Sequence, residues 1–140
     1  MPKVKNTCVS KVKGQKSEIQ SINLIENLGV EGDFHAKGGE RQVSLLAEES
    51  IQKMREKGLT LLPGAFGENV VTEGIDLLSL SVGKKIKIGE AELEISKIGK
   101  ECPARCQIYY LAGDCIMPRE GVFAKVIKGG IIKAGDEIIL

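Results

Sequence analysis

Glycine recurs between short apolar runs along the whole chain, and this pattern constrains the fold more than any other feature of the sequence. There are 17 glycines in 140 residues, well above the usual share of roughly 7%. They are spread along the chain, so they do not mark a low-complexity segment. Glycines between short β-rich runs are typical of tight turns in a barrel or a sandwich. The spacing therefore predicts a mostly β fold.

The strongest local signal is a β-hairpin. Residues 84–88 and 91–98 both alternate apolar and polar side chains, and Gly89 and Glu90 lie between them. Such a pair of runs around a two-residue turn is typical of a hairpin. Residues 21–28 could form a strand or a short helix. Further short strands are expected over residues 6–12, 41–46, 68–72, 121–127, 131–132 and 137–140, with a turn over residues 14–17.

One segment has the pattern of a helix. Over residues 47–57, the side chains of Ala47, Ile51 and Met54 share one face at spacings of four and three. Gly58 can supply the left-handed residue that often ends a helix. About eight short strands and this helix predict a single barrel-like domain over residues 1–140, mostly β with one or two short helices.

Composition limits the classes of partner. Hydrophobic residues make up 42% and charged residues 28% of the chain, the net charge is +1 and the pI is near 7.6. This balance gives no general electrostatic attraction to nucleic acid or to a membrane surface. With three Phe, two Tyr and no Trp, the chain also lacks the aromatic platforms that bind single-stranded nucleic acid. We therefore expect neither nucleic acid nor a membrane as a partner.

The N-terminus indicates a cytoplasmic protein. Basic residues occur in it, but no apolar run follows them, so it does not resemble a signal peptide. No stretch approaches the length that a bilayer-spanning helix needs. In the cytosol the four cysteines are expected to be thiols or metal ligands and not disulfides.

The cysteine-rich segment over residues 100–125 is the first candidate site. It holds three of the four cysteines, and Cys106 directly follows Arg105. A thiolate is a strong nucleophile and a soft metal ligand, and a neighbouring cation lowers the pKa of the thiol. A reactive thiol at Cys106 is therefore one hypothesis. The alternative is that these cysteines pack as small hydrophobic residues, as buried free cysteines usually do.

The second candidate site is the segment GDFHAKGGER at residues 32–41, which contains the single histidine, His35. Gly38 and Gly39 would let backbone N–H groups approach an anion, and Lys37 and Arg41 would add positive charge for a phosphate. The simpler interpretation of this stretch alone is a glycine turn with solvated charges.

Asn69 is a third candidate. It ends the segment of residues 66–69, which reads Phe-Gly-Glu-Asn. Its amide could form two hydrogen bonds to a heterocycle, or it could hold a loop. Taken alone, it is more typical of a turn residue.

Taken together, the segments GDFHAKGGERQVSLLAEESI, GAFGENVV and ECPARCQIY…GDCIMPREGVFAKV resemble a small stand-alone MOSC domain. This module is named for the C-terminal part of molybdenum cofactor sulfurase. The resemblance covers nearly the whole chain in the same order, and the three motifs are specific together. It implies a β-barrel built around one reactive cysteine. The last segment is similar to members that are joined to a molybdopterin-biosynthesis domain.

The resemblance also implies site residues. In better understood relatives a cysteine after an Arg, beyond a Gly-x-x-x-Leu hairpin, provides a sulfur ligand to molybdenum, and Arg105 and Cys106 match that pair. Cys106 is thus the expected metal ligand and catalytic thiol, with Cys115 as the second candidate. Asn69 matches an Asn that faces the cofactor, and Ser44 matches a Ser ahead of the helix. The expected set for binding the pterin and its phosphate is His35, Lys37, Gly38, Gly39, Arg41, Ser44, Asn69, Arg105 and Arg119.

Three functions remain open on the sequence. The first is a protein of cofactor maturation that binds the molybdenum cofactor (molybdopterin), or carries sulfur for it, through Cys106. Its partners would be the pterin cofactor and molybdopterin-biosynthesis proteins or molybdoenzymes. The second is a molybdenum-dependent oxidoreductase that reduces N-hydroxylated bases. Gly67 stands where those reductases carry an Arg, and their separate N-terminal domain is not expected here, which favours the first function. The third is a β domain without a cofactor.

Overall fold

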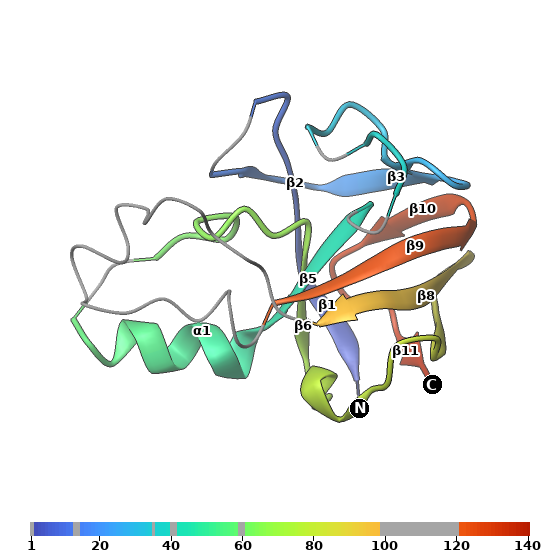
Figure 1. Cartoon of the computed structure of the whole chain (residues 1–140). Coiled ribbons are helices and arrows are strands. Elements are labelled where there is room, and N and C mark those ends of the chain that lie inside the picture. Colours follow the sequence, from blue (N-terminus) through green and yellow to red (C-terminus); the bar gives the residue numbers. More distant parts are fainter. Residues whose placement is uncertain (1, 13–14, 35, 40–41, 59–60, 99–120) are drawn as a thin grey trace.

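The computed structural model describes residues 2–12, 15–34, 36–39, 42–58, 61–98 and 121–140. Strands dominate these residues, as Figure 1 shows. This confirms the prediction of a mostly β fold with one or two short helices. The helices are α1 (Glu48–Arg55) and a single 3-10 turn, η1 (Leu77–Ser79). The strands are β1 (Lys3–Val9), β2 (Ser17–Ile19), β3 (Ser21–Ile25), β4 (Gly29–Val30), β5 (Val43–Ala47), β6 (Val70–Glu73), β7 (Lys85–Ile88), β8 (Ala91–Ile98), β9 (Val122–Lys128), β10 (Gly130–Lys133) and β11 (Ile138–Ile139).

The strands form two sheets. The larger sheet has the order β11-β7-β8-β9-β5-β6-β1-β2, and the smaller one has the order β10-β3-β4. The main hydrophobic core contains side chains from most of these strands. Its members include Val4, Leu24, Val43, Val70, Ile86, Leu93, Ala124 and Ile132.

The β7–β8 hairpin forms where the sequence predicts it. Gly89 has a φ of 57°, which suits the first central position of a two-residue turn in which only glycine fits easily. The register places Lys85 opposite Glu94 and Lys87 opposite Glu92. Opposite charges that face each other across two strands stabilise that register.

The predicted barrel is not a closed ladder of strands in the described part of the chain. An isolated bridge joins Lys3 of β1, the second strand from one edge, to Glu137, the residue before the opposite edge strand β11. Three backbone hydrogen bonds lie beside it, from Val4 N to Asp136 O at 2.8 Å, from Gly135 N to Val4 O at 2.7 Å and from Ile138 N to Pro2 O at 3.0 Å. Because β11 has only two residues, turn residues and not a full strand make this junction.

The larger sheet also contains a parallel β–α–β unit, which consists of β5, α1 and β6. β5 and β6 pair in parallel, with Leu45 opposite Val70, and α1 connects them as such crossovers require. In Figure 1, α1 follows β5 and lies at the lower left, away from the turn between β9 and β10 at the right. The helix and its flanking loop cover a second buried cluster, which consists of Leu46, Ile51, Met54, Phe66, Val71 and Phe123.

The helix was predicted over residues 47–57, and its main features are confirmed. Ala47 is the residue before the first turn, and Glu56 follows the last. Gly58 has a φ of 91° and donates its N–H to Arg55 O at 2.9 Å, which is the left-handed ending that the glycine predicts. The observed helix, Glu48–Arg55, is thus slightly shorter than the predicted range of residues 47–57.

Strand β2 was not predicted: its first residue, Ser17, was expected to end a turn, and the next two had no assignment. All three of its residues are exposed, so no apolar periodicity marks it in the sequence. It forms because β1 offers a free edge, against which Thr7, Cys8 and Val9 pair with Ile19, Glu18 and Ser17. Tertiary pairing here decides the conformation of a short polar segment.

Candidate functional site

The structure describes five of the predicted site residues. They are Lys37, Gly38, Gly39, Ser44 and Asn69. The others lie outside the described residues, as does Cys102: these are His35, Arg41, Arg105, Cys106, Cys115 and Arg119. Their roles stay predictions.

Asn69 and Ser44 lie side by side at the start of the parallel strand pair. The side-chain oxygen of Asn69 accepts the N–H of Ser44 at 3.0 Å, and its amide nitrogen donates to the carbonyl of Cys8 at 3.1 Å. Two backbone bonds add to these, from Asn69 N to Ser44 O at 2.8 Å and from Cys8 N to Asn69 O at 2.7 Å. Asn69 is completely buried. Its amide therefore ties β1 to β5 at the point where β6 begins.

Ser44 carries an unsatisfied polar atom. Its side chain is buried, and its hydroxyl has no hydrogen-bond partner among the described residues. Ser44 pairs with Phe123 of β9. A buried hydroxyl without a partner costs about 1–3 kcal/mol.

The cysteine segment joins the described fold next to these residues. It connects β8 to β9, whose facing ends are the paired residues Ile98 and Val122. Val122 pairs in turn with Leu45, the neighbour of Ser44. One attachment point of the segment, Val122, therefore lies beside β5, and the other, Ile98, lies one strand further away.

The described part of the glycine loop, residues 32–34 and 36–39, is held by contacts with other described residues. Gly38 and Gly39 have φ values of 75° and 76°, a region that glycine adopts readily. The N–H of Gly38 donates to Leu28 O at 3.2 Å, so this amide already has a partner. The ammonium group of Lys37 lies 3.8 Å from the centre of the Phe34 ring. The described part of the predicted anion site therefore consists of Gly39 and an exposed lysine.

Gln42 holds the end of this loop and separates it from the cysteine segment. Its side chain donates to Gly39 O at 3.0 Å and accepts the N–H of Val126 at 3.0 Å. Gln42 precedes Leu45, the partner of Val122, by three residues, which is about 10 Å along an extended strand. The loop thus joins β5 at its start, and the segment enters β9 beside Leu45, in the middle of β5.

Cys8 is the one cysteine that the structure describes, and it lies in β1 as the sequence predicts. Its side chain is completely buried. Burial, followed by the nearby charges of Glu68 and Glu18, raises the pKa of the Cys8 thiol from 9.0 to about 12, although Lys16 acts in the opposite direction. A thiol that stays protonated at neutral pH is a poor nucleophile and a poor metal ligand.

We therefore expect Cys8 to resist alkylation. At a pH below its pKa, a thiol with a pKa of about 12 in place of 9.0 has roughly a thousandth of the thiolate. Treating the native protein with iodoacetamide near neutral pH should leave Cys8 unmodified, and mass mapping after denaturation in the same reagent should show it labelled. Rapid labelling of native Cys8 would show that β1 opens readily.

A group of buried charges that the sequence analysis missed lies beneath the same region. The ammonium group of Lys16 contacts both carboxylate oxygens of Asp33, at 2.8 and 3.0 Å, and both side chains are completely buried. Glu68, next to Asn69, is also completely buried. In the sequence these residues resemble ordinary loop charges, and only the three-dimensional arrangement of their loops reveals them.

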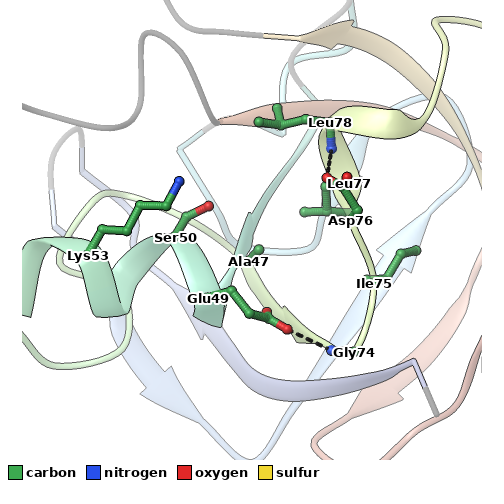
Figure 2. A pocket seen from close by; sticks show the side chains of 9 residues that line it. All are labelled: Ala47, Glu49, Ser50, Lys53, Gly74, Ile75, Asp76, Leu77 and Leu78. Atoms are coloured by element: carbon green, nitrogen blue, oxygen red, sulfur yellow. Dashed lines mark hydrogen bonds between the residues drawn. The ribbon is translucent and has the colours of Figure 1, made fainter.

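A separate hollow of about 340 Å³ lies between α1 and the residues after β6. Figure 2 shows Ser50 and Lys53 of α1 on one side and Leu77 and Leu78 on the other. The carboxylate of Glu49 accepts the N–H of Gly74 at 3.0 Å and closes one end. This hollow lies at the carboxyl ends of β5 and β6, whereas Ser44 and Asn69 lie at their amino ends.

The described residues contain no group of three or more His, Cys, Asp or Glu side chains arranged to hold a metal ion. No helix in the described part of the chain is long and apolar enough to cross a membrane.

Comparisons with known proteins agree with this fold. YuaD from Bacillus subtilis superposes with a TM-score of 0.80 at 21% identity, over 99% of this chain and 94% of that one. YiiM from Geobacillus stearothermophilus gives 0.76 at 18% identity, over 100% and 75%. YiiM from Escherichia coli gives 0.69 at 22% identity, over 99% and 69%. No curated protein matches the sequence significantly.

The family model of the MOSC domain matches residues 31–139. This range covers the glycine loop, the β5–α1–β6 unit and the whole cysteine segment. The resemblance inferred from the three motifs is thereby confirmed: the chain belongs to the MOSC domain family.

Proposed function

We propose that this protein binds the molybdenum cofactor, or carries sulfur for it, through Cys106. The observation that carries the proposal is the match to the MOSC family over the range that includes the cysteine segment. When bound, the cofactor would supply a molybdenum centre held by the dithiolene of a pterin. The task of this chain would be to bind the pterin and its phosphate and to present a thiolate.

The distribution of the thiols supports this assignment. Cys8 is excluded as a ligand because it is completely buried and its pKa is raised to about 12. The remaining cysteines, 102, 106 and 115, all belong to the segment that enters β9 beside β5. A thiolate is a suitable ligand for a metal that biology holds with soft sulfur. Arg105 next to Cys106 would favour the thiolate form.

The polar groups on β5 and before β6 also fit a bound cofactor. The buried hydroxyl of Ser44 lacks a partner among the described residues, and a heterocycle could supply one. Asn69 holds Ser44 in position through both its backbone and its side chain. Ser44 would thus contact the cofactor, and Asn69 would act chiefly by fixing Ser44.

Gly67 supports the binding role over the reductase alternative. Its φ is 79°, and its N–H donates to Gly64 O at 2.9 Å. An Arg at this position, as the resemblance implies for the reductases, would have to adopt a left-handed conformation that costs about 1–2 kcal/mol. The tight turn of this chain instead needs a residue that adopts a positive φ easily, as glycine does.

The experiment that tests the proposal is metal analysis combined with pterin fluorescence. The protein should be purified without oxygen from a host that makes the cofactor and is supplied with molybdate. Molybdenum and pterin should be retained together in a constant ratio. Protein that retains neither, although it is folded by circular dichroism, would contradict a role in cofactor binding.

The predicted phosphate contacts can be tested on the same material. Replacing Lys37 and Arg41 together with Ala should weaken binding of the phosphorylated pterin by about tenfold at low salt, because two cations near the phosphate are lost. The matched control replaces Lys85 and Lys87 of β7, which are also exposed, with Ala. Equal effects of both double changes would mean that only the total charge matters, and unchanged affinity would mean that the loop is only a turn.

A further inference from the structure

A buried ion pair joins the start of the glycine loop to the residues before β2. The ammonium group of Lys16 contacts the two carboxylate oxygens of Asp33 at 2.8 and 3.0 Å, and neither side chain is exposed. Asp33 also accepts the N–H of Ser10 at 3.0 Å, and the N–H of Phe34 donates to Ser10 O at 2.7 Å. The start of the glycine loop is therefore held on two sides, by Lys16 and by the residue that follows β1.

The backbone of Lys16 lies against the turn that precedes Asn69. The N–H of Lys16 donates to Gly64 O at 2.8 Å. A Cβ added to Gly64 would lie 2.1 Å from the carbonyl oxygen of Lys16, so the two backbones are in direct contact. Glu68 closes the turn, since its carboxylate accepts the N–H of Gly64 at 2.9 Å and the N–H of Phe66 at 3.0 Å. Lys16 thus contacts this turn with its backbone and the glycine loop with its side chain.

These contacts connect the two described parts of the proposed cofactor site. On one side, Lys37 and the glycine pair follow Asp33 closely in the sequence. On the other side, Asn69 directly follows Glu68 and bonds to Ser44 through both its backbone and its side chain. A ligand that contacts both sides binds more tightly when their separation is already fixed, because ordering a loop on binding costs free energy.

We propose that Lys16 and Asp33 are positioning residues, whose ion pair holds the glycine loop and the turn before Asn69 at a fixed separation. The inference rests on the proposed function in one respect: the loop and the Asn69 side are taken to contact the phosphate and the pterin of one ligand. Lys16 and Asp33 act on that ligand only through the loop and the turn, because both of their side chains are completely buried.

An ion pair suits this role better than an apolar contact does. Apolar burial is non-directional, whereas the N–H donors of an ammonium group and the two oxygens of a carboxylate form directional bonds. A buried ion pair often adds little stability compared with uncharged residues of similar volume. Replacing both residues together should therefore loosen the arrangement of the loops more than it destabilises the whole domain.

Native-state hydrogen exchange without any ligand tests whether the pair holds the loops. Lys16→Met combined with Asp33→Asn removes both charges and keeps an oxygen for the N–H of Ser10. In this double variant the amides of Lys16, Phe34 and Gly38 should exchange faster, by about tenfold or more, because their segments open locally. Strand β8 should keep its protection.

A surface ion pair provides the matched control for the exchange experiment. Lys3 and Glu73 lie 3.2 Å apart and are partly exposed to solvent. Lys3→Met combined with Glu73→Gln makes the same kind of change there. This control should leave the exchange of the loop amides unchanged, because surface ion pairs contribute little.

The second measurement is the affinity of the folded protein for the phosphorylated pterin, followed by pterin fluorescence. The variant without the buried pair should bind about tenfold more weakly, because the loop must be ordered on binding. Lys37→Ala should reduce the affinity less in this variant than in the wild-type protein, since the two changes act on one connected unit. Gly58→Ala, which strains the end of α1, should lower the stability and keep the affinity.

Three results would overturn the positioning role: unchanged exchange in the double variant, faster exchange that β8 shares, or unchanged affinity despite faster exchange. A wild-type protein that binds no pterin contradicts the proposed function instead, and the exchange experiment then decides whether the pair holds the loops. If the double variant does not fold, exchange of the wild-type protein in low urea replaces it. The amides of Lys16, Phe34 and Gly38 should then open with one common free energy, and unequal values would overturn the role.

Discussion

Replacing Cys106 with Ala should remove most of the molybdenum from the purified protein, by about tenfold or more. Loss of even a group behind a metal ligand typically costs 10–100-fold in affinity, roughly, and Cys106 is the proposed ligand itself. The domain should stay folded, because the described residues alone form two buried hydrophobic clusters. Metal analysis per mole of protein measures the loss, and circular dichroism checks the fold.

The other cysteines provide matched controls for this change. Cys8→Ala removes a thiol whose pKa is raised to about 12, so it should leave the molybdenum content unchanged. Cys115→Ala tests the second candidate. If Cys115→Ala loses the metal and Cys106→Ala keeps it, the ligand is Cys115. If neither variant changes the metal content of the loaded protein, neither Cys106 nor Cys115 is the molybdenum ligand.

Local physics explains the parts of the fold that the sequence predicts. The β7–β8 hairpin and α1 follow from alternation and helical spacing, and Gly89 and Gly58 end their elements with positive φ values as expected. In each case, residues near in sequence determine the geometry. This is why the boundaries agree within a few residues.

Long-range pairing explains the parts that it does not predict. The parallel pair of β5 and β6 joins Leu45 to Val70, and the junction between Lys3 and Glu137 connects the two ends of the chain. No local pattern encodes either contact. The glycines suggested a barrel, whereas the described strands form an open sheet with a short junction between Lys3 and Glu137.

The candidate site was only partly predictable for the same reason. Ser44 and Asn69 were selected from motifs, and the structure places them in contact. Glu68 was not selected, because a glutamate in a glycine-rich turn resembles a solvated charge. Its burial depends on how close the backbone of Lys16 comes to that turn, and the residue that permits this approach is Gly64.

Gly64→Ala should lower the free energy of unfolding by about 2–5 kcal/mol. Gly64 has a φ of 90°, and an added Cβ would lie 2.1 Å from the backbone oxygen of Lys16. The left-handed conformation costs roughly 1–2 kcal/mol for alanine. Forcing an atom into a packed contact costs typically about 1–3 kcal/mol more. Urea unfolding followed by circular dichroism measures the total.

Gly58→Ala is the matched control that separates these two costs. Gly58 has a φ of 91°, but an added Cβ there would meet no atom of the described residues within 4 Å. It should therefore lose only the roughly 1–2 kcal/mol of backbone strain. The difference between the two variants measures the steric part, because the φ angles of the two glycines are nearly equal. If Gly64→Ala costs no more than Gly58→Ala, the turn before β6 can move away from Lys16 without penalty, and the close approach that buries Glu68 does not contribute to stability.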